Sequence, residues 1–190
     1  MSVHDLKPIT ALGGTTPQVD VVAGVTLREN PGLALASVSA RIGHEDACSA
    51  HLADLLEGAA PAAGKCRLHD PEAAFWMGPN QWMVGAPFET HEDLAAQLKA
   101  RFGNTASITE QTDAWACFDL RGDGMEAVME LCCNVNIRAM QTGDATRTSI
   151  HHLGCFVLRR DPANWVRILG PRASAGSLHH ALFTAMKSAL

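Results

Sequence analysis

A long internal repeat most limits what this chain can fold into. The stretch 74–102 predicts a strand, a tight turn, a second strand and an amphipathic helix. The stretch 155–186 has the same order of parts, and Trp165 stands in it where Trp82 stands in the first copy. A repeat of this length indicates duplicated supersecondary units that share a core. It says nothing yet about chemistry.

The first copy belongs to a predicted half that spans residues 32–112. Its elements are a strand at 33–39, a helix at 45–57, the hairpin of the repeat, a helix that Thr90 caps and Gly103 ends, and a closing strand at 105–109. Period-two and period-3.6 spacing of apolar residues supports each element.

The second predicted half spans residues 113–190. Its elements are a strand from Trp115, a helix capped by Asp123, one long strand over 145–160 bent at Gly154, a returning strand at 164–169 and a helix from Ala173. The two halves match in order. We therefore expect an α+β protein, built from two duplicated ferredoxin-like (split β-α-β) halves with antiparallel sheets and packed as one compact unit.

Residues 1–31 precede both halves and show little periodicity between their prolines. We expect an irregular arm on the surface, with one short strand at 19–27. Ordering such an arm costs about 1–2 kcal/mol per residue in backbone entropy, so it must bury itself against something. In a subunit of a complex, the arm would pack against a neighbour.

Composition excludes several classes. The chain has 190 residues, a net charge of −5 and no basic stripe, which argues against a nucleic-acid binder. No apolar run approaches the ~20 residues of a membrane-spanning helix, and the first residues lack the apolar core of a signal peptide. We expect a cytoplasmic protein. Charged residues make up only 18%, which favours a surface partly covered by another protein.

The sequence offers no catalytic, cofactor or metal motif. Its six cysteines contain no C-x-x-C pair, and we expect most of them to be small buried residues. His151 and His152 fall on the predicted long strand, where they would point to opposite faces and could not share one metal. A G-x-S-x-G elbow and a dinucleotide loop are also absent. We predict no catalytic, cofactor-binding or metal-binding residue in this chain.

Arginines and tryptophans are the remaining candidates. Arginines gather in the second half, where bidentate contacts to carboxylates could bridge subunits: Arg147, Arg159, Arg160, Arg167 and Arg172. The four tryptophans are either core residues or interface anchors. As structural or contact residues we select Trp76, Trp82, Arg147, Arg172 and His179.

Several motifs, in their order and spacing, resemble one known family. They are the W-x-G-P-x-x-W turn at 76–82, the Q-T-D-A-W stretch at 111–115, the T-R-T-S strand at 146–149 and the terminal P-R-x-x-x-x-S-L-x-H-A-L helix from Pro171. Over roughly residues 33–190 the chain resembles the gamma subunit of heterotetrameric sarcosine oxidase. It also resembles the folate-binding domain of the glycine cleavage T protein.

The resemblance implies a role in a flavin-dependent complex that demethylates sarcosine to glycine, with hydrogen peroxide and methylene-tetrahydrofolate as further products. It implies that FAD, FMN, NAD and tetrahydrofolate sites lie in the alpha and beta subunits and zinc in delta, while the gamma chain holds no cofactor and is not catalytic. Two alternatives stay open: the gamma subunit of a related N-methyl amino acid dehydrogenase, and a tetrahydrofolate-binding module. A stand-alone aminomethyl-transfer enzyme is disfavoured, because no placed acid or base was found.

Overall fold

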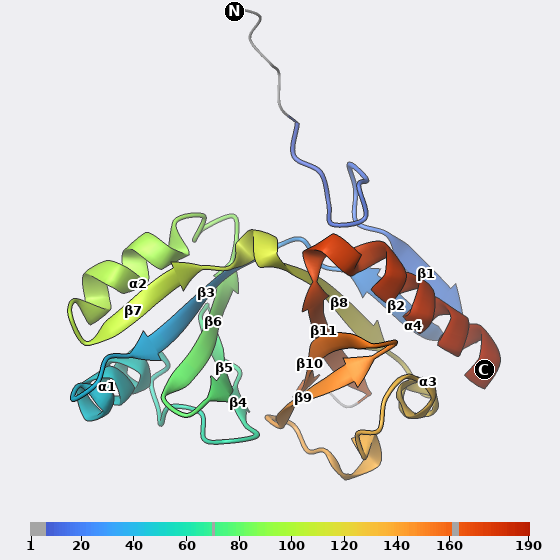
Figure 1. The fold of residues 1–190 in the computed structure, drawn as a ribbon. Helices are drawn as coiled ribbons and strands as arrows, with labels where there is room; N and C mark the ends of the chain where they lie inside the picture. The colour runs from blue at the N-terminus through green and yellow to red at the C-terminus, as the bar shows by residue number, and fades with distance from the viewer. Residues whose placement is uncertain (1–6, 70, 161–163) are drawn as a thin grey trace, which may run out of the picture.

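Two antiparallel sheets with helices on their outer sides make up the fold (Figure 1). The computed structural model describes residues 7–69, 71–160 and 164–190. Each sheet is a mixture of local hairpins and longer crossovers, and every strand pair is antiparallel. The α+β class with antiparallel sheets is therefore confirmed.

The first sheet has five strands in the order β4-β5-β6-β3-β7. Its elements are β3 (Leu33–Ala40), α1 (Glu45–Leu55), β4 (Cys66–Arg67), β5 (Ala73–Gly78), β6 (Gln81–Pro87), α2 (Leu94–Phe102) and β7 (Ala106–Glu110). The predicted hairpin of the first repeat is present as β5 and β6, with the turn at Pro79-Asn80. The predicted strand at 33–39 and the closing strand near 105–109 are also present.

The second sheet has six strands in the order β1-β2-β8-β11-β10-β9. Its elements are β1 (Val19–Val22), β2 (Val25–Glu29), β8 (Trp115–Arg121), α3 (Met125–Cys132), β9 (Ala145–Ile150), β10 (Leu153–Arg160), β11 (Trp165–Pro171) and α4 (Ala175–Ala189). Short 3-10 turns lie at Thr112–Ala114, Ile137–Ala139 and Arg172–Ser174.

Three apolar clusters hold these layers together. One lies between the five-stranded sheet and helices α1 and α2, and a second lies between the six-stranded sheet and helices α3 and α4. The third joins the inner faces of the two sheets, where the rings of Phe75 and Phe156 lie 5.0 Å apart. Backbone hydrogen bonds between residues 64–66 and 143–145 tie the same two sheets together at one corner.

The N-terminal segment differs from the irregular surface arm that we expected from the sequence. Residues 19–27 do not form one strand on the surface, because the chain reverses at Ala23-Gly24, where both residues have positive φ (44° and 84°). The resulting hairpin joins the six-stranded sheet, with β2 paired to β8. Val25 and Leu27 are fully buried in the core of that sheet. The segment therefore packs within its own chain.

The long strand expected over 145–160 is also corrected. It is a hairpin of β9 and β10, and Gly154 is an ordinary paired position within it. His151 and His152 form the turn with φ of 47° and 68°, a conformation that histidine adopts more readily than β-branched residues do. They are exposed turn residues, so the argument from opposite strand faces does not apply to them.

Helix starts differ from the expected caps. Helix α2 begins at Leu94, and the Thr90 hydroxyl bonds to the Nδ1 of His91 (2.8 Å), so Thr90 is not its N-cap. The N-cap of α3 is Gly124, because Asp123 instead accepts a 2.7 Å hydrogen bond from Asn164. Gly103 ends α2 with a φ of 53°, as predicted.

Candidate functional site

The inner face of the six-stranded sheet carries an unusual set of charges. In one row across three neighbouring strands, Arg160 of β10 lies opposite Trp165 of β11, and Trp165 lies opposite Arg121 of β8. In the next row, Leu158 is followed by Arg167, Asp119 and Arg28. A third row, with Phe156, Leu169 and Cys117, belongs to the apolar contact with the other sheet. The inner face thus changes from apolar to charged along the strands.

Asp119 and Arg167 form a buried bidentate ion pair. The Nε of Arg167 donates to Oδ1 of Asp119 at 2.8 Å, and its NH2 group donates to Oδ2 at 2.9 Å. The side-chain amide of Asn30 and the indole N–H of Trp165 each donate to the same carboxylate at 3.0 Å. Asp119 therefore has four donors, three from β11 and one from Asn30 just after β2, and it is the polar centre of this face.

Electrostatics keeps this centre charged. Burial alone would raise the pKa of Asp119, but the hydrogen bonds and charge of Arg167, with the donors of Asn30 and Trp165, hold that pKa below its usual range. Burial would likewise lower the pKa of Arg167, and the bond to Asp119 more than offsets this, so its pKa is raised. Both groups are ionised at neutral pH, and their charges cancel.

The indole ring of Trp165 packs against the guanidinium groups of Arg121 and Arg160. The guanidinium carbon of Arg121 lies 3.4 Å from the centroid of the indole, and that of Arg160 lies 4.6 Å from it. Such cation–π contacts position an arginine without neutralising its charge. The burial of Arg160, followed by the charge of Arg167, lowers the pKa of the Arg160 guanidinium.

Two adjoining cavities open along these rows. One, of about 360 Å³, lies between the sheets and is lined by Arg160 and Arg167 together with apolar residues that include Leu33, Leu68 and Ala73. The other, of about 630 Å³, is lined by three arginines and two carboxylates: Arg28, Arg121, Arg167, Glu29 and Asp119. Both include Asn30 and Gly32, where the chain passes from one sheet to the other. We call this region, defined by Arg28, Arg121, Arg160, Arg167 and Trp165, the arginine cleft.

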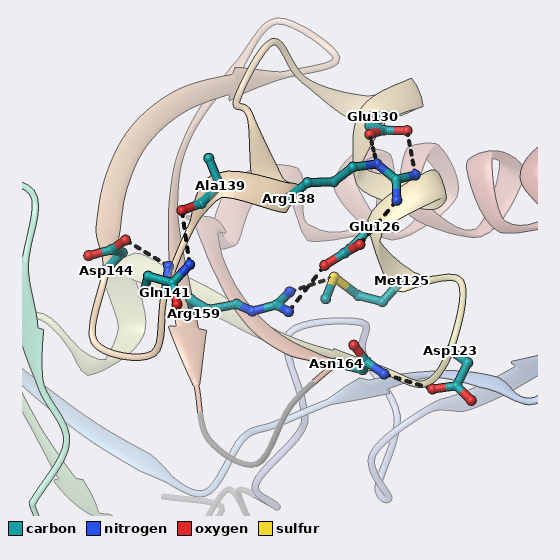
Figure 2. Close-up of polar contacts among 10 residues, drawn as sticks. All are labelled: Asp123, Met125, Glu126, Glu130, Arg138, Ala139, Gln141, Asp144, Arg159 and Asn164. Carbon is teal, nitrogen blue, oxygen red and sulfur yellow. Dashed lines mark hydrogen bonds and ion pairs between the residues drawn. The ribbon is translucent and has the colours of Figure 1, made fainter.

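Three arginines of the cleft lack a carboxylate partner within the described ranges: Arg28, Arg121 and Arg160. Arginines on the helix side of the same sheet differ. Figure 2 shows Arg159 bound to Glu126 of α3 (3.2 Å), and Arg138 bound to both Glu126 (3.3 Å) and Glu130 (3.1 Å). The positive charge of the cleft is thus a local feature in a chain of net charge −5.

The two selected tryptophans lie in the first half. Trp82 of β6 is buried under α1 and α2, and its indole N–H donates to the carbonyl of Pro61 at 2.9 Å. Trp76 of β5 is half-buried against the same core. Trp82 is therefore a core residue of this chain.

The other three selected residues belong to the second half. Arg147 is exposed on β9, 5.6 Å above the ring of Phe156. Arg172 donates to the carbonyl of Ile9 at 3.2 Å, and His179 of α4 lies 2.8 Å from Asp20 of β1. The structure does not bring the five selected residues together, and their part in contacts with another protein stays a prediction.

Asp119, Asn30, Arg28 and Arg121 were not selected from the sequence. One signal was available: Asp119 and Arg121 alternate with apolar Phe118 and Leu120, which indicates a charged sheet face. Alternation alone could not show that this face is covered by a second sheet. Arg167 does make a bidentate contact to a carboxylate, but its partner is in the same chain.

Cysteines and histidines offer little further chemistry. All six thiols are free, and burial raises the pKa of Cys117 and that of Cys132 to about 12. Such thiols are poor nucleophiles. Within residues 7–69, 71–160 and 164–190, no three histidine, cysteine or acidic side chains are grouped closely enough to hold a metal ion. No described helix has the length and apolarity needed to cross a membrane.

The chain is therefore an α+β protein with two sheets. Known structures share this fold. A chain of heterotetrameric sarcosine oxidase from Corynebacterium sp. U-96, solved with pyrrole 2-carboxylate, is 22% identical over 86% of this chain and 84% of its own, with a TM-score of 0.75. The glycine cleavage system aminomethyltransferase T from Bartonella henselae is 13% identical, with a TM-score of 0.63. That match covers 85% of this chain but only 46% of the aminomethyltransferase.

No protein-family model matches the chain, and no curated protein matches its sequence. At these identities the two structures establish a shared fold.

Proposed function

We propose that this chain is a non-catalytic structural subunit of a flavin-dependent heterotetrameric oxidase that demethylates sarcosine. The observation that carries the proposal is the shared fold along most of both chains with a chain of heterotetrameric sarcosine oxidase. In this proposal the partners are alpha, beta and delta subunits, which hold FAD, FMN, NAD, tetrahydrofolate and zinc. A related N-methyl amino acid dehydrogenase is the nearest variant.

The chemistry of the described residues supports a structural role. The buried thiols are poorly nucleophilic, and the best-formed polar centre, Asp119 with Arg167, is a neutral ion pair whose donors and acceptors are mutually satisfied. Both members of this pair are held in their ionised forms by their contacts, so neither is poised to exchange a proton. We infer that the chain contributes to the complex by assembly, which stabilises its partners by mass action.

We further infer that the two halves are duplicated ferredoxin-like units. Read from one edge, the first sheet runs β4-β5-β6-β3-β7 and the second runs β9-β10-β11-β8-β2-β1. The positions correspond, and the helices follow the same strands in both. Two differences are that β2 from the N-terminal hairpin occupies the place that β7 holds in the first half, and that β1 adds a sixth strand beyond it.

The test is affinity purification of the tagged full chain from its native host, followed by mass spectrometry and an absorption spectrum of the eluate. The proposal predicts three further chains in the eluate and the absorption bands of bound flavin. Turnover with sarcosine, compared with other N-methyl amino acids, would then identify the substrate. A colourless eluate with this chain alone would contradict the proposal.

A tetrahydrofolate-binding module is the second candidate, and the fold shared with aminomethyltransferase T favours it. Titration of the full chain with tetrahydrofolate distinguishes the two candidates. The structural-subunit proposal predicts no saturable binding of tetrahydrofolate to this chain.

A further inference from the structure

We propose that the arginine cleft is a binding site for a small organic carboxylate. This inference rests on the geometry of the cleft and is independent of the assembly role. The carboxylate would be bound between the two sheets by guanidinium groups that have no acidic partner in the described part of the chain, and its apolar body would pack on the facing sheet.

Charge is the first argument. Four arginines line the two cavities, and the Asp119 carboxylate between them is already occupied by Arg167, Asn30 and Trp165. Glu29 also lines the larger cavity, where its carboxylate accepts hydrogen bonds from the backbone of Leu12 and Gln18. Asp119 and Glu29 together offset two of the four positive charges, and two remain among the described lining residues. Bringing several like charges together costs free energy unless an anion completes the site. Two of them, Arg121 and Arg160, are also fixed in orientation by Trp165, so little side-chain entropy remains to be lost on binding.

An unfulfilled donor is the second argument. The Nε of Arg160 is buried and has no hydrogen-bond partner among the residues that the structure describes. A buried polar group without a partner costs about 1–3 kcal/mol, more when it is charged. Burial and the nearby Arg167 already lower the pKa of the Arg160 guanidinium. A shift of the Arg160 side chain toward the cavity would let a bound carboxylate accept from this donor. The carboxylate would also reverse the effect on the pKa, because a nearby negative charge favours the ionised arginine.

The opposite wall decides between an organic and an inorganic anion. On the side of the five-stranded sheet, the smaller cavity is lined mostly by apolar residues, with one histidine among them: Leu33, Leu68, His69, Ala73 and Pro87. Its volume of about 360 Å³ falls in the range of small-molecule sites. A free phosphate or sulfate would leave this apolar wall uncovered, whereas a carboxylate with a hydrocarbon or aromatic body would cover it. The site therefore fits an organic carboxylate better.

The experiment uses the full chain and isothermal titration with isophthalate, a dicarboxylate on one aromatic ring. We expect saturable binding that weakens with added salt. Two matched ligands separate the contribution of the charge to binding from that of the aromatic ring. Neutral isophthalamide keeps the ring without the charge, and inorganic phosphate keeps the charge without the ring. We expect both to bind at least tenfold more weakly than isophthalate.

Three variants test the residues. Arg160→Gln and Arg121→Gln should each raise the Kd for isophthalate about tenfold or more, because each removes a charge-assisted contact. Arg147→Gln is the control: it removes an arginine from the same sheet, but Arg147 lines neither cavity of the cleft, so the Kd should not change. Far-UV circular dichroism checks that each variant is folded. Arg121 is exposed, so we expect its replacement to leave the fold intact.

Several outcomes would overturn the inference. They are the absence of saturable isophthalate binding to the folded chain, equal affinity for isophthalamide, equal affinity for phosphate, and an Arg147→Gln effect as large as that of Arg160→Gln. Isophthalate binding with no flavin partner in the affinity purification would refute the assembly role and leave this inference standing, so the two proposals can fail separately.

Discussion

Asp119 shows how one side chain can decide the character of a sheet face. It lies between apolar Phe118 and Leu120 on β8, and four donors bind its carboxylate, so its burial costs little. Removing one partner of a buried ion pair lowers the free energy of unfolding strongly, because the remaining charge stays buried without a partner. The first two predictions concern single residues of this kind.

Asp119→Asn should destabilise the protein by about 3 kcal/mol and reduce its sensitivity to acid. The pKa of Asp119 is lower in the folded than in the unfolded state. Its contribution is therefore complete above the unfolded pKa of about 3.9, and is lost as pH falls through the folded pKa. Urea unfolding between pH 2 and pH 7 measures this.

The matched control for that experiment is Asp54→Asn, which breaks an ion pair with Arg101 in which Asp54 is 78% exposed. Exposed pairs contribute little, so the control should keep the acid dependence of the unmodified chain. If Asp119→Asn shows the same acid dependence as that control, Asp119 does not have a depressed pKa.

Trp82→Ala should lower the free energy of unfolding by about 3–5 kcal/mol, because it leaves a cavity under α1 and α2 and an unpaired carbonyl at Pro61. Trp82→Phe keeps most of the volume and should cost less. Chemical denaturation measures both. If an intact flavin complex containing the Trp82→Ala chain is recovered, its turnover should be unchanged, and a specific loss of turnover would contradict a structural role.

At the scale of elements, the N-terminal hairpin completes a sheet that the second half leaves one strand short. Glu29 at the end of β2 is 2% exposed and accepts hydrogen bonds from the backbone of Leu12 and Gln18, so the preceding loop is attached to the hairpin. His179 on α4 holds Asp20 of β1 from the helix side. The hairpin is therefore part of the core of the second half.

Deletion of residues 1–31 should prevent the second half from folding. The deletion removes Val25 and Leu27 from the core, each worth about 1.5–3 kcal/mol, and exposes the edge of β8. Deletion of residues 1–6 keeps Val25, Leu27 and the whole of β2, so it is the control and should leave stability unchanged. Amide hydrogen exchange in β8 and β11 measures the difference. Protection retained in the longer deletion would mean that β2 is dispensable.

At the scale of the whole molecule, the two halves meet through one apolar cluster and one corner of backbone hydrogen bonds. Lys65 and Asp144 add an ion pair at the same corner. Because each half also has its own core, the contact between the sheets decides whether the chain unfolds as one unit.

Phe75→Ala should uncouple the two halves. Phe75 is 4% exposed and packs on Phe156 of the other sheet, so its loss should cost about 3–5 kcal/mol, mostly from the contact between the sheets. We expect one urea transition in the unmodified chain and two in the variant, followed by tryptophan fluorescence and circular dichroism together. Phe88→Ala, at an exposed position after β6, is the control and should keep a single transition. A single unfolding transition in Phe75→Ala would contradict the prediction, because the two halves would then still unfold together without this contact.

Local patterns were sufficient for much of the secondary structure. Apolar spacing placed α1 and α4 within a few residues, and Gly103 marked the end of α2, because these signals act between near neighbours in the chain. The same patterns failed at two turns. Ala23-Gly24 and His151-His152 reverse the chain inside stretches whose alternation continues on both sides, so period-two spacing shows no break.

The sequence by itself determined the class of the fold, most of its elements and the lack of catalytic motifs, because periodicity and turn chemistry depend on neighbouring residues. Only the tertiary structure decided that β2 enters the second sheet, that Asp119 faces Arg167 across 48 positions of the chain, and that Arg121 and Arg160, from two strands, lie over the ring of Trp165. These contacts join segments far apart in sequence, and nothing in local spacing specifies which sheet face another layer will cover.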